Sequence, residues 1–228
     1  MKEKMQEQDR SNGSCLLTIA AAYVLLVVGI SLLPGRLPYE MVREHGPIET
    51  LSAAGYFYFC LFLFHFNSIG AVQTSFAPGL FVFLLGLREL DFHQRFTTMG
   101  VFKTKFFISP GVPVVEKIIV TILLVAVLIY GIIYLRRALP TFKGDLLDGR
   151  PSSLSIACAV GCAVLSKFLD GNSEIFGDMF PMVENFETFS ITVEECLELF
   201  IPVFFLQALL QYGRESVRRY AAESAVEN

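Results

Sequence analysis

Long apolar runs alternate with short polar stretches along the whole chain. Six of the runs have about 17–25 residues, the length that a helix needs to cross the apolar core of a bilayer. They cover residues 15–34, 49–66, 70–88, 113–135, 153–169 and 191–212. The pattern predicts an all-α polytopic membrane protein, a bundle of about six transmembrane helices at 15–212 with cytoplasmic tails at 1–14 and 213–228.

The prolines agree with these boundaries, because proline is tolerated best at helix ends and in connections. Eight of them are expected there: Pro34, Pro38, Pro47, Pro110, Pro113, Pro140, Pro151 and Pro181. Pro78 and Pro202 lie inside the third and sixth runs, where they predict helix kinks.

The composition supports the membrane assignment. The chain is 54% hydrophobic and 18% charged, whereas soluble domains are about 45–50% apolar and about 25% charged. A net charge of −4 without any block of basic residues gives no reason to expect nucleic-acid binding. Five cysteines without a CxxC or CxxCH pattern exclude zinc-ribbon and haem c sites.

Lysine and arginine counts give the orientation, since cytoplasmic loops carry the excess of positive charge. With the N-terminus inside, the inner segments hold ten basic residues and the outer segments eight. We therefore expect both termini in the cytoplasm.

The parity of six spans brings several polar segments to one face of the membrane. These segments are REHGPIE (43–49), LRELDFHQRF (87–96), Glu116-Lys117, SKFLDG (166–171) and ITVEECLE (191–198). Ionisable groups at the membrane edge are costly unless they pair or contact water. We expect their side chains to form one shared polar site, which lies on the outer face of the membrane in this orientation.

Which side chains of LRELDFHQRF share a helix face depends on where the third helix ends. If that helix continues past Leu90, Arg88, Asp91 and Arg95 share one stripe, and Glu89 lies one turn before His93. The two arginines are candidates for binding an anionic substrate group.

The second and sixth helices supply carboxyl groups. Gly46-Pro47 marks the first turn of the second helix, which places Glu49 inside that turn and His45 just outside it. In the sixth helix Glu194 and Glu198 are one turn apart. We expect Ser190 or Thr192 to cap that helix, with the acids in its first turns.

These residue types favour three kinds of site. The candidate catalytic acids and bases are Glu49, Asp91, His93 and Glu198, and the candidate substrate-binding residues are Arg88 and Arg95. A divalent metal is possible on His45, His93 and Glu194, although no HExxH pattern supports it. Segment 171–190 mixes acids with Phe and Met, which predicts an amphipathic lid over the site.

Three of these motifs carry a resemblance that covers most of the chain. EHGPIE before the second span, LRELDFHQRF after the third and EExxE at the start of the last resemble small polytopic proteins of the bacterial inner membrane with no assigned activity. The resemblance implies a bacterial inner-membrane location. Glu194-Glu195 is also similar to the paired glutamates of CAAX-type intramembrane proteases, but Leu199 replaces the arginine of that motif, which excludes the family.

Two functions stay open from the sequence. The first is an enzyme or binding protein that handles a lipid or lipid-linked headgroup. The second is a non-catalytic subunit of an envelope complex, whose ion pairs are structural and whose partner is another membrane protein or a second copy. A proton- or cation-coupled transporter is a third, more distant possibility, because the acids gather on one face. Membrane lipids are the expected partners in each case.

Overall fold

Helices joined by short connections make up the part of the chain that the computed structural model describes, which comprises residues 2–43, 45–70, 72, 74–101, 104–179 and 186–226. Only the backbone is described for residues 2–12, 93, 95, 173–179, 187 and 218–226. The α-helices are α1 (Lys2–Ser31), α2 (Leu37–Val42), α3 (Pro47–Ser68), α4 (Phe76–Glu89), α5 (Thr104–Ile108), α6 (Val114–Leu147), α7 (Pro151–Met179) and α8 (Phe186–Val226). A 3₁₀-helix, η1 (Phe92–Arg95), follows α4.

Four segments of the described chain are long and apolar enough to cross a membrane. They are Gly13–Ser31 in α1, Leu37–Ser68 over α2 and α3, Val114–Leu147 in α6 and Pro151–Asn172 in α7. The fourteen residues of α4 extend about 21 Å at 1.5 Å per residue, less than the ~30 Å apolar core of a bilayer. The fold is therefore that of a helical membrane protein, with four such segments where the apolar runs predicted six.

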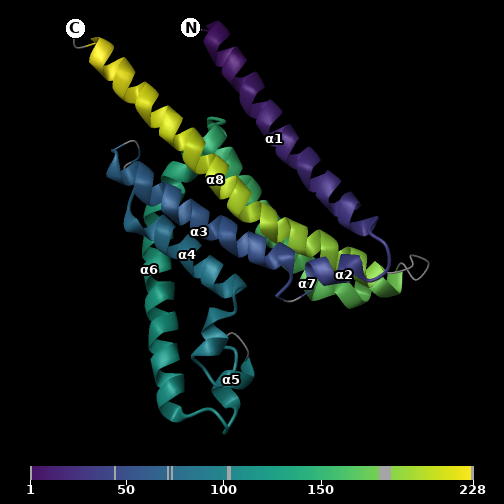
Figure 1. Ribbon diagram of the computed structural model, residues 1–228. Coiled ribbons are helices and arrows are strands. Elements are labelled where there is room, and N and C mark those ends of the chain that lie inside the picture. Colours follow the sequence, from purple (N-terminus) through teal and green to yellow (C-terminus); the bar gives the residue numbers. More distant parts are fainter. Residues whose placement is uncertain are drawn as a thin grey trace.

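Two helical hairpins form the centre of the molecule. α7 and α8 pack against each other along most of their shared length, and α3 packs against both α4 and α8. α1 and α2 contact α8 from the other side, so α8 is surrounded over its middle part. The first residues of α1 and the last residues of α8 lie at the same end of the bundle (Figure 1).

A close approach of two helices fixes the α3–α8 contact. A Cβ atom added to Gly55 on α3 would lie 2.9 Å from Cγ of Pro202 on α8. Only glycine at position 55 allows the helices to meet this closely, since real Cβ atoms essentially never approach another atom to that distance. The rings of Phe59 and Phe205 pack one turn further along, with centroids 5.9 Å apart.

α6 stands beside this centre rather than within it (Figure 1). It contacts the start of α7, and its Tyr130 stacks on Phe81 of α4 with ring centroids 5.8 Å apart. Only 6% of the most apolar stretch of this helix is buried inside the protein. Its remaining Ile, Val and Leu side chains thus present an apolar surface suited to lipid.

The helix boundaries correct two predictions made from prolines and agree with the position predicted for a third. Pro78 lies in the first turn of α4, which begins at Phe76, so it does not interrupt that helix. Pro140 lies inside α6, which continues for seven residues beyond it, rather than in a connection. Pro202 does lie inside α8, as predicted, and the helix continues on both sides of it.

The ends of the apolar runs are also not the ends of the helices. Residues 2–14 continue α1 and residues 213–226 continue α8, so both predicted tails are helical where the structure describes them. Of the predicted lid, residues 171–179 extend α7 and residues 186–190 begin α8. The described parts of the segment thus belong to the α7–α8 hairpin rather than to a separate lid, and residues 180–185 lie outside the described chain.

Candidate functional site

Four helices contribute polar side chains to one region, which we call the polar cluster. Its members are Glu49, Ser52 and Tyr56 of α3, Arg88 and Glu89 of α4, Ser166, Lys167 and Asp170 of α7, and Glu194, Glu195 and Glu198 of α8. On α3, α7 and α8 spacings of three or four residues bring members of each set to one side of the helix, whereas Arg88 and Glu89 are adjacent at the end of α4. The α3–α4 hairpin, α7 and α8 meet here, which is why residues far apart in sequence come together.

Glu198 is the centre of the polar cluster. Its carboxylate oxygen Oε1 accepts a hydrogen bond of 2.7 Å from the buried hydroxyl of Ser166. The same oxygen lies 3.3 Å from Nζ of Lys167 and 3.8 Å from Nη2 of Arg88. The Glu198 side chain is only 11% exposed, whereas those of Lys167 and Arg88 are 50% and 41% exposed. One buried acid thus holds two half-exposed cations from different helices side by side.

The contacts of Glu198 leave part of its carboxylate available. Oε2 makes no hydrogen bond or ion pair with the described residues, while Oε1 receives all three partners. Lys167 also donates a hydrogen bond of 3.1 Å to Oδ2 of Asp170. The cations are therefore positioned by acids on one side and accessible on the other.

Glu89 is buried and, among the described residues, has no hydrogen-bonding partner. It is the last residue of α4 and is 7% exposed. Its carboxyl group forms no hydrogen bond or ion pair with the described residues, although Glu198, Arg88 and Glu49 lie within electrostatic range. Tyr56, which is 2% exposed, lies beside it. A buried carboxylate in such surroundings is unfavourable unless a proton or a cation compensates it.

Glu194 and Glu195 extend the polar cluster along α8. Glu194 lies within electrostatic range of Asp170 and Lys167, and Glu195 within range of Glu198 and Glu49. The prediction that these acids occupy the first turn of their helix is wrong, because α8 begins at Phe186. Thr192 does not cap it either, since its hydroxyl donates to the carbonyl of Thr188 within the same helix.

His45 and Asp91 lie near each other on the segments that lead into α3 and out of α4. His45 Nε2 is 3.9 Å from Asp91 Oδ2, and the backbone N–H of His45 donates to Oε2 of Glu49. Both residues have positive φ angles, 62° for His45 and 47° for Asp91. Non-glycine residues rarely adopt this conformation, so the two turns are tightly specified by their surroundings.

The stripe predicted for Arg88, Asp91 and Arg95 does not exist. α4 ends at Glu89, with Leu90 as its C-cap, and the chain then turns into η1. Arg88 points into the polar cluster, whereas Asp91 lies beside His45. The side chains of Arg95 and His93 are outside the described part of the structure.

The predicted metal ligands are not gathered in the described residues. No group of three or more His, Cys, Asp or Glu side chains there has an arrangement that could hold a metal ion. His45 pairs with Asp91, while Glu194 belongs to the part of the polar cluster around Lys167. The third predicted ligand, His93, has no described side chain.

Glu116 and Lys117, which were expected on the same face as the polar cluster, make a different set of contacts. The Glu116 carboxylate accepts hydrogen bonds from the N–H and the hydroxyl of Thr98, at 2.7 and 2.6 Å. Lys117 donates to the carbonyl of Ser109 at 2.7 Å. These bonds fix the connection that carries η1 and α5 to the start of α6.

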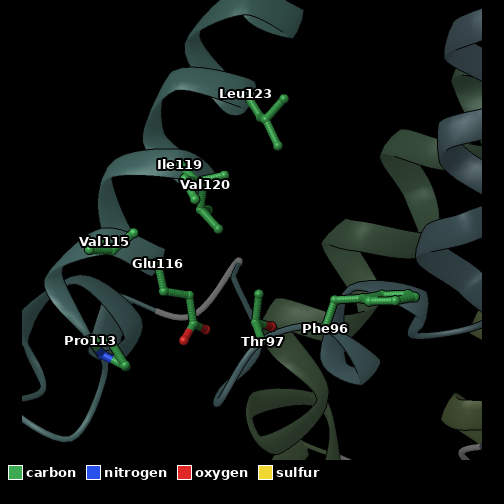
Figure 2. A pocket seen from close by; sticks show the side chains of 8 residues that line it. All are labelled: Phe96, Thr97, Pro113, Val115, Glu116, Ile119, Val120 and Leu123. Carbon is green, nitrogen blue, oxygen red and sulfur yellow. The ribbon is translucent and has the colours of Figure 1, made fainter.

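A cavity of about 430 Å³ lies between the start of α6 and the chain that follows η1 (Figure 2). Phe96, Thr97, Pro113, Val115, Glu116, Ile119, Val120 and Leu123 line it. Most of its lining side chains are apolar, and the carboxylate of Glu116, one of the polar exceptions, accepts a hydrogen bond from the hydroxyl of Thr98. The cavity is separate from the polar cluster, with which it shares no residue.

A second group of polar residues lies between α7 and α8, towards the other end of the hairpin. Ser155 donates to Oε1 of Gln211 at 2.8 Å, and Ser152 donates to Oε2 of Glu215 at 3.1 Å. Gln207, one turn before Gln211, is buried and neither atom of its amide group has a partner in the described chain. Polar side chains thus hold the hairpin together at both ends.

The structure brings together some of the predicted site residues and separates others. Glu49, Arg88, Glu194 and Glu198 belong to the polar cluster, whereas His45 and Asp91 form a neighbouring pair.

Sequence reasoning had not assigned Ser52 or Tyr56 to the site, and it gave no role to Glu89, Ser166 or Lys167, which lie in polar segments that it expected on this face. The signal for the first two is the stripe Glu49, Ser52 and Tyr56 at i, i+3 and i+7 in an otherwise apolar helix.

Comparisons with protein-family models, curated proteins and solved structures found no match for this chain.

Proposed function

We propose that this protein is a six-span protein of the bacterial inner membrane, with both termini in the cytoplasm, that binds the phosphate group of a lipid or lipid-linked molecule at the outer face. α4 with the residues before it, and the apolar middle part of α8, complete the six spans in this proposal. The polar cluster is the binding site, and α6 and α1 face the lipid.

The pairing of Arg88 and Lys167 through Glu198 is the observation that carries the proposal. Each cation is about half exposed, and both lie within 4 Å of the same carboxylate oxygen. Arginine and lysine placed side by side are suited to a phosphate, which accepts several charge-assisted hydrogen bonds. The acid behind them fixes their positions before the ligand arrives, which lowers the entropy lost on binding.

The neighbouring carboxyl groups allow chemistry on the bound headgroup. Glu198 keeps one carboxylate oxygen without a partner among the described residues, and Glu49 borders the same region. Either group is placed to accept or donate a proton. The proposed catalytic roles of Asp91 and His93, and the proposed anion-binding role of Arg95, depend on the adjoining η1 segment.

A structural role for the ion pairs is the competing proposal, in which the protein is a subunit of an envelope complex. The observation in its favour is that Glu198 joins three helices by itself, through Ser166, Lys167 and Arg88. Removing this carboxylate lowers the stability of the protein whether or not a ligand binds there.

Native mass spectrometry of the detergent-solubilised protein separates the two proposals. Phosphatidylglycerol, phosphatidylethanolamine and diacylglycerol with the same acyl chains serve as probes, because only the first two carry a phosphate. We expect the wild-type protein to retain the phospholipids and not diacylglycerol. Arg88→Gln and Lys167→Gln should each lower this retention, whereas Arg43→Gln, which removes an exposed cation paired with Glu40 outside the polar cluster, should not.

The same variants identify the structural alternative. If Arg88→Gln and Lys167→Gln lower the melting temperature but leave phospholipid retention unchanged, the ion pairs serve packing only. Equal retention of diacylglycerol and phospholipids by the wild-type protein would also contradict the proposed phosphate recognition.

A further inference from the structure

The cavity between α6 and the chain after η1 has no part in the proposed function, because it shares no residue with the polar cluster. Its volume of about 430 Å³ lies within the range of about 300–1,000 Å³ that is usual for small-molecule sites. Val115, Ile119 and Leu123 project from α6, and Phe96 and Thr97 lie across from them (Figure 2). Two separate segments of the chain therefore border a space of ligand size.

A small hydrophobic core supports this space from behind. Where the connection between η1 and α6 packs on the first turns of α6, four side chains are buried against one another: Val101, Phe106, Val112 and Val120. Close-packed side chains resist rearrangement, so they hold the two segments at a fixed separation. The cavity is thus a feature of the packed fold and does not depend on surface side chains alone.

The two polar side chains that line the cavity have partners within the protein. The hydroxyl of Thr97 donates to the carbonyl of Met99 at 2.9 Å, and the carboxylate of Glu116 accepts two hydrogen bonds from Thr98. The other lining side chains are those of Phe, Pro, Val, Ile and Leu, which form no hydrogen bonds. The cavity therefore favours an apolar ligand.

The position of the cavity along α6 places it where the apolar core of the membrane begins. Glu116 and Lys117 lie at the start of α6, and eighteen uncharged residues follow them. Ile119 and Leu123 belong to this uncharged stretch, and their side chains are 53% and 60% exposed. The wall of the cavity is therefore continuous with the surface of α6 that is suited to lipid.

The cavity also has the length of a lipid chain. From Val115 to Leu123, α6 rises about 12 Å at 1.5 Å per residue. One leaflet contributes half of the ~30 Å apolar core of a bilayer, so a lipid chain extends over about 15 Å. The side of the cavity that α6 forms is thus comparable in length with one hydrocarbon chain.

We infer that this cavity is a binding site for one hydrocarbon chain of a membrane lipid. The chain lies along Val115, Ile119 and Leu123, with Phe96 on its other side, and the polar end of the lipid lies at the level of Glu116. A lipid held between two segments of the protein contacts more side chains than one that touches a single exposed helix, so it binds more tightly. The inference does not depend on the proposed phosphate site.

Quenching of tryptophan fluorescence by brominated lipid chains tests the inference. The chain has no Trp, so Phe96→Trp introduces a single fluorophore at the cavity. Phe64→Trp is the matched control, because Phe64 lies on α3 outside the cavity and is 75% exposed, against 72% for Phe96. Phosphatidylglycerol with dibrominated chains is titrated into each full-length variant in detergent, where bromine quenches a tryptophan that it contacts.

We expect the Phe96→Trp variant to need about tenfold less brominated lipid for half-maximal quenching than the Phe64→Trp variant, a difference of about 1.4 kcal/mol. Dibrominated diacylglycerol should show the same difference, because the cavity holds the chain and not the phosphate. Adding Leu123→Phe to the Phe96→Trp variant narrows the cavity and should remove the difference. Leu128→Phe is its control, since Leu128 is 63% exposed on the same helix and does not line the cavity.

Three results would overturn the inference. The first is equal half-maximal lipid concentrations in the Phe96→Trp and Phe64→Trp variants, as expected for lipids that only exchange at the surface. The second is a difference that Leu123→Phe leaves as large as Leu128→Phe does. The third is quenching of the Phe64→Trp variant without any quenching of the Phe96→Trp variant, which would show that protein and not lipid covers the cavity.

Discussion

The hydroxyl group of Ser52 on α3 donates a hydrogen bond of 3.4 Å to the backbone carbonyl of Glu198 on α8. Pro202, four residues further along α8, has no N–H, so this carbonyl lacks its usual helical donor. Inside a membrane protein no bulk water replaces such a donor. The same proline that packs against Gly55 therefore also creates the acceptor that Ser52 satisfies.

Ser52→Ala should lower the free energy of unfolding by about 1 kcal/mol, because it leaves a buried carbonyl without a donor. The chain has no Trp, so a thiol-reactive fluorogenic dye is the suitable probe of unfolding in detergent. It reports the exposure of Cys196, which is buried, in a background where the exposed Cys15 is replaced.

Ser31→Ala is the control for this variant. The hydroxyl of Ser31 donates to the carbonyl of Val27 within α1, where no proline removes the backbone donor. We expect this substitution to change the free energy of unfolding by no more than about 0.5 kcal/mol. Equal losses in the two variants would show that the carbonyl freed by Pro202 needs no donor from α3.

Gly55→Ala should separate α3 from α8. The added methyl group would lie 2.9 Å from Pro202, and over-packing of this kind costs about 1–3 kcal/mol. Gly161→Ala on α7, where an added Cβ meets nothing within 4 Å, should instead stabilise by about 0.5–1 kcal/mol through helix propensity. Thermal unfolding of both variants checks the prediction, which fails if Gly55→Ala is as stable as Gly161→Ala.

Gln207→Leu should stabilise the α7–α8 hairpin by about 1 kcal/mol, because the buried amide has no partner in the described chain and leucine has a similar size. Gln211→Leu should have the opposite effect, since it removes the acceptor of the buried Ser155 hydroxyl. The pair is compared by the same unfolding assay. A loss of stability in Gln207→Leu as large as that in Gln211→Leu would indicate that Gln207 has a partner in the folded protein.

Glu198→Gln should destabilise the protein by about 1–3 kcal/mol, because the neutral amide no longer compensates Lys167 and Arg88. Glu40→Gln removes an ion pair with Arg43 in which both side chains are about half exposed. Exposed pairs contribute about 0–1 kcal/mol, so this control should unfold near the wild-type temperature. Similar melting temperatures for the two variants would mean that Glu198 contributes no more than a surface acid.

Single cysteines in a cysteine-free variant test the six-span arrangement. Arg43 and Pro110 precede α3 and α6, whereas Ser68 ends α3 and Asp148 follows α6, and all four positions are exposed. A membrane-impermeant maleimide on intact cells should label cysteines at 43 and 110, and should reach those at 68 and 148 only after permeabilisation. Labelling of 43 and 110 from opposite sides would rule out this span count.

The apolar runs alone determined that the chain is helical and where its long helices lie. Each of the six predicted runs overlaps a helix, since a backbone surrounded by apolar side chains satisfies its hydrogen bonds best within a helix. The parity of those runs also indicated that Glu49, Arg88 and Glu198 lie at one end of the bundle. This inference needed only the order of the helices.

Only the tertiary structure decided where helices end and which side chains meet. α4 ends at Glu89 and α8 begins at Phe186, so Asp91 leaves the stripe of Arg88 and joins His45, while Glu194 lies well inside its helix. Among the described residues, Glu89 makes no hydrogen bond or ion pair, although Arg88 is its neighbour in the chain. Helix crossing angles and the close contact at Gly55 set these distances. The angles and the contact depend on residues far apart in sequence, whereas the apolar period is a property of each segment by itself.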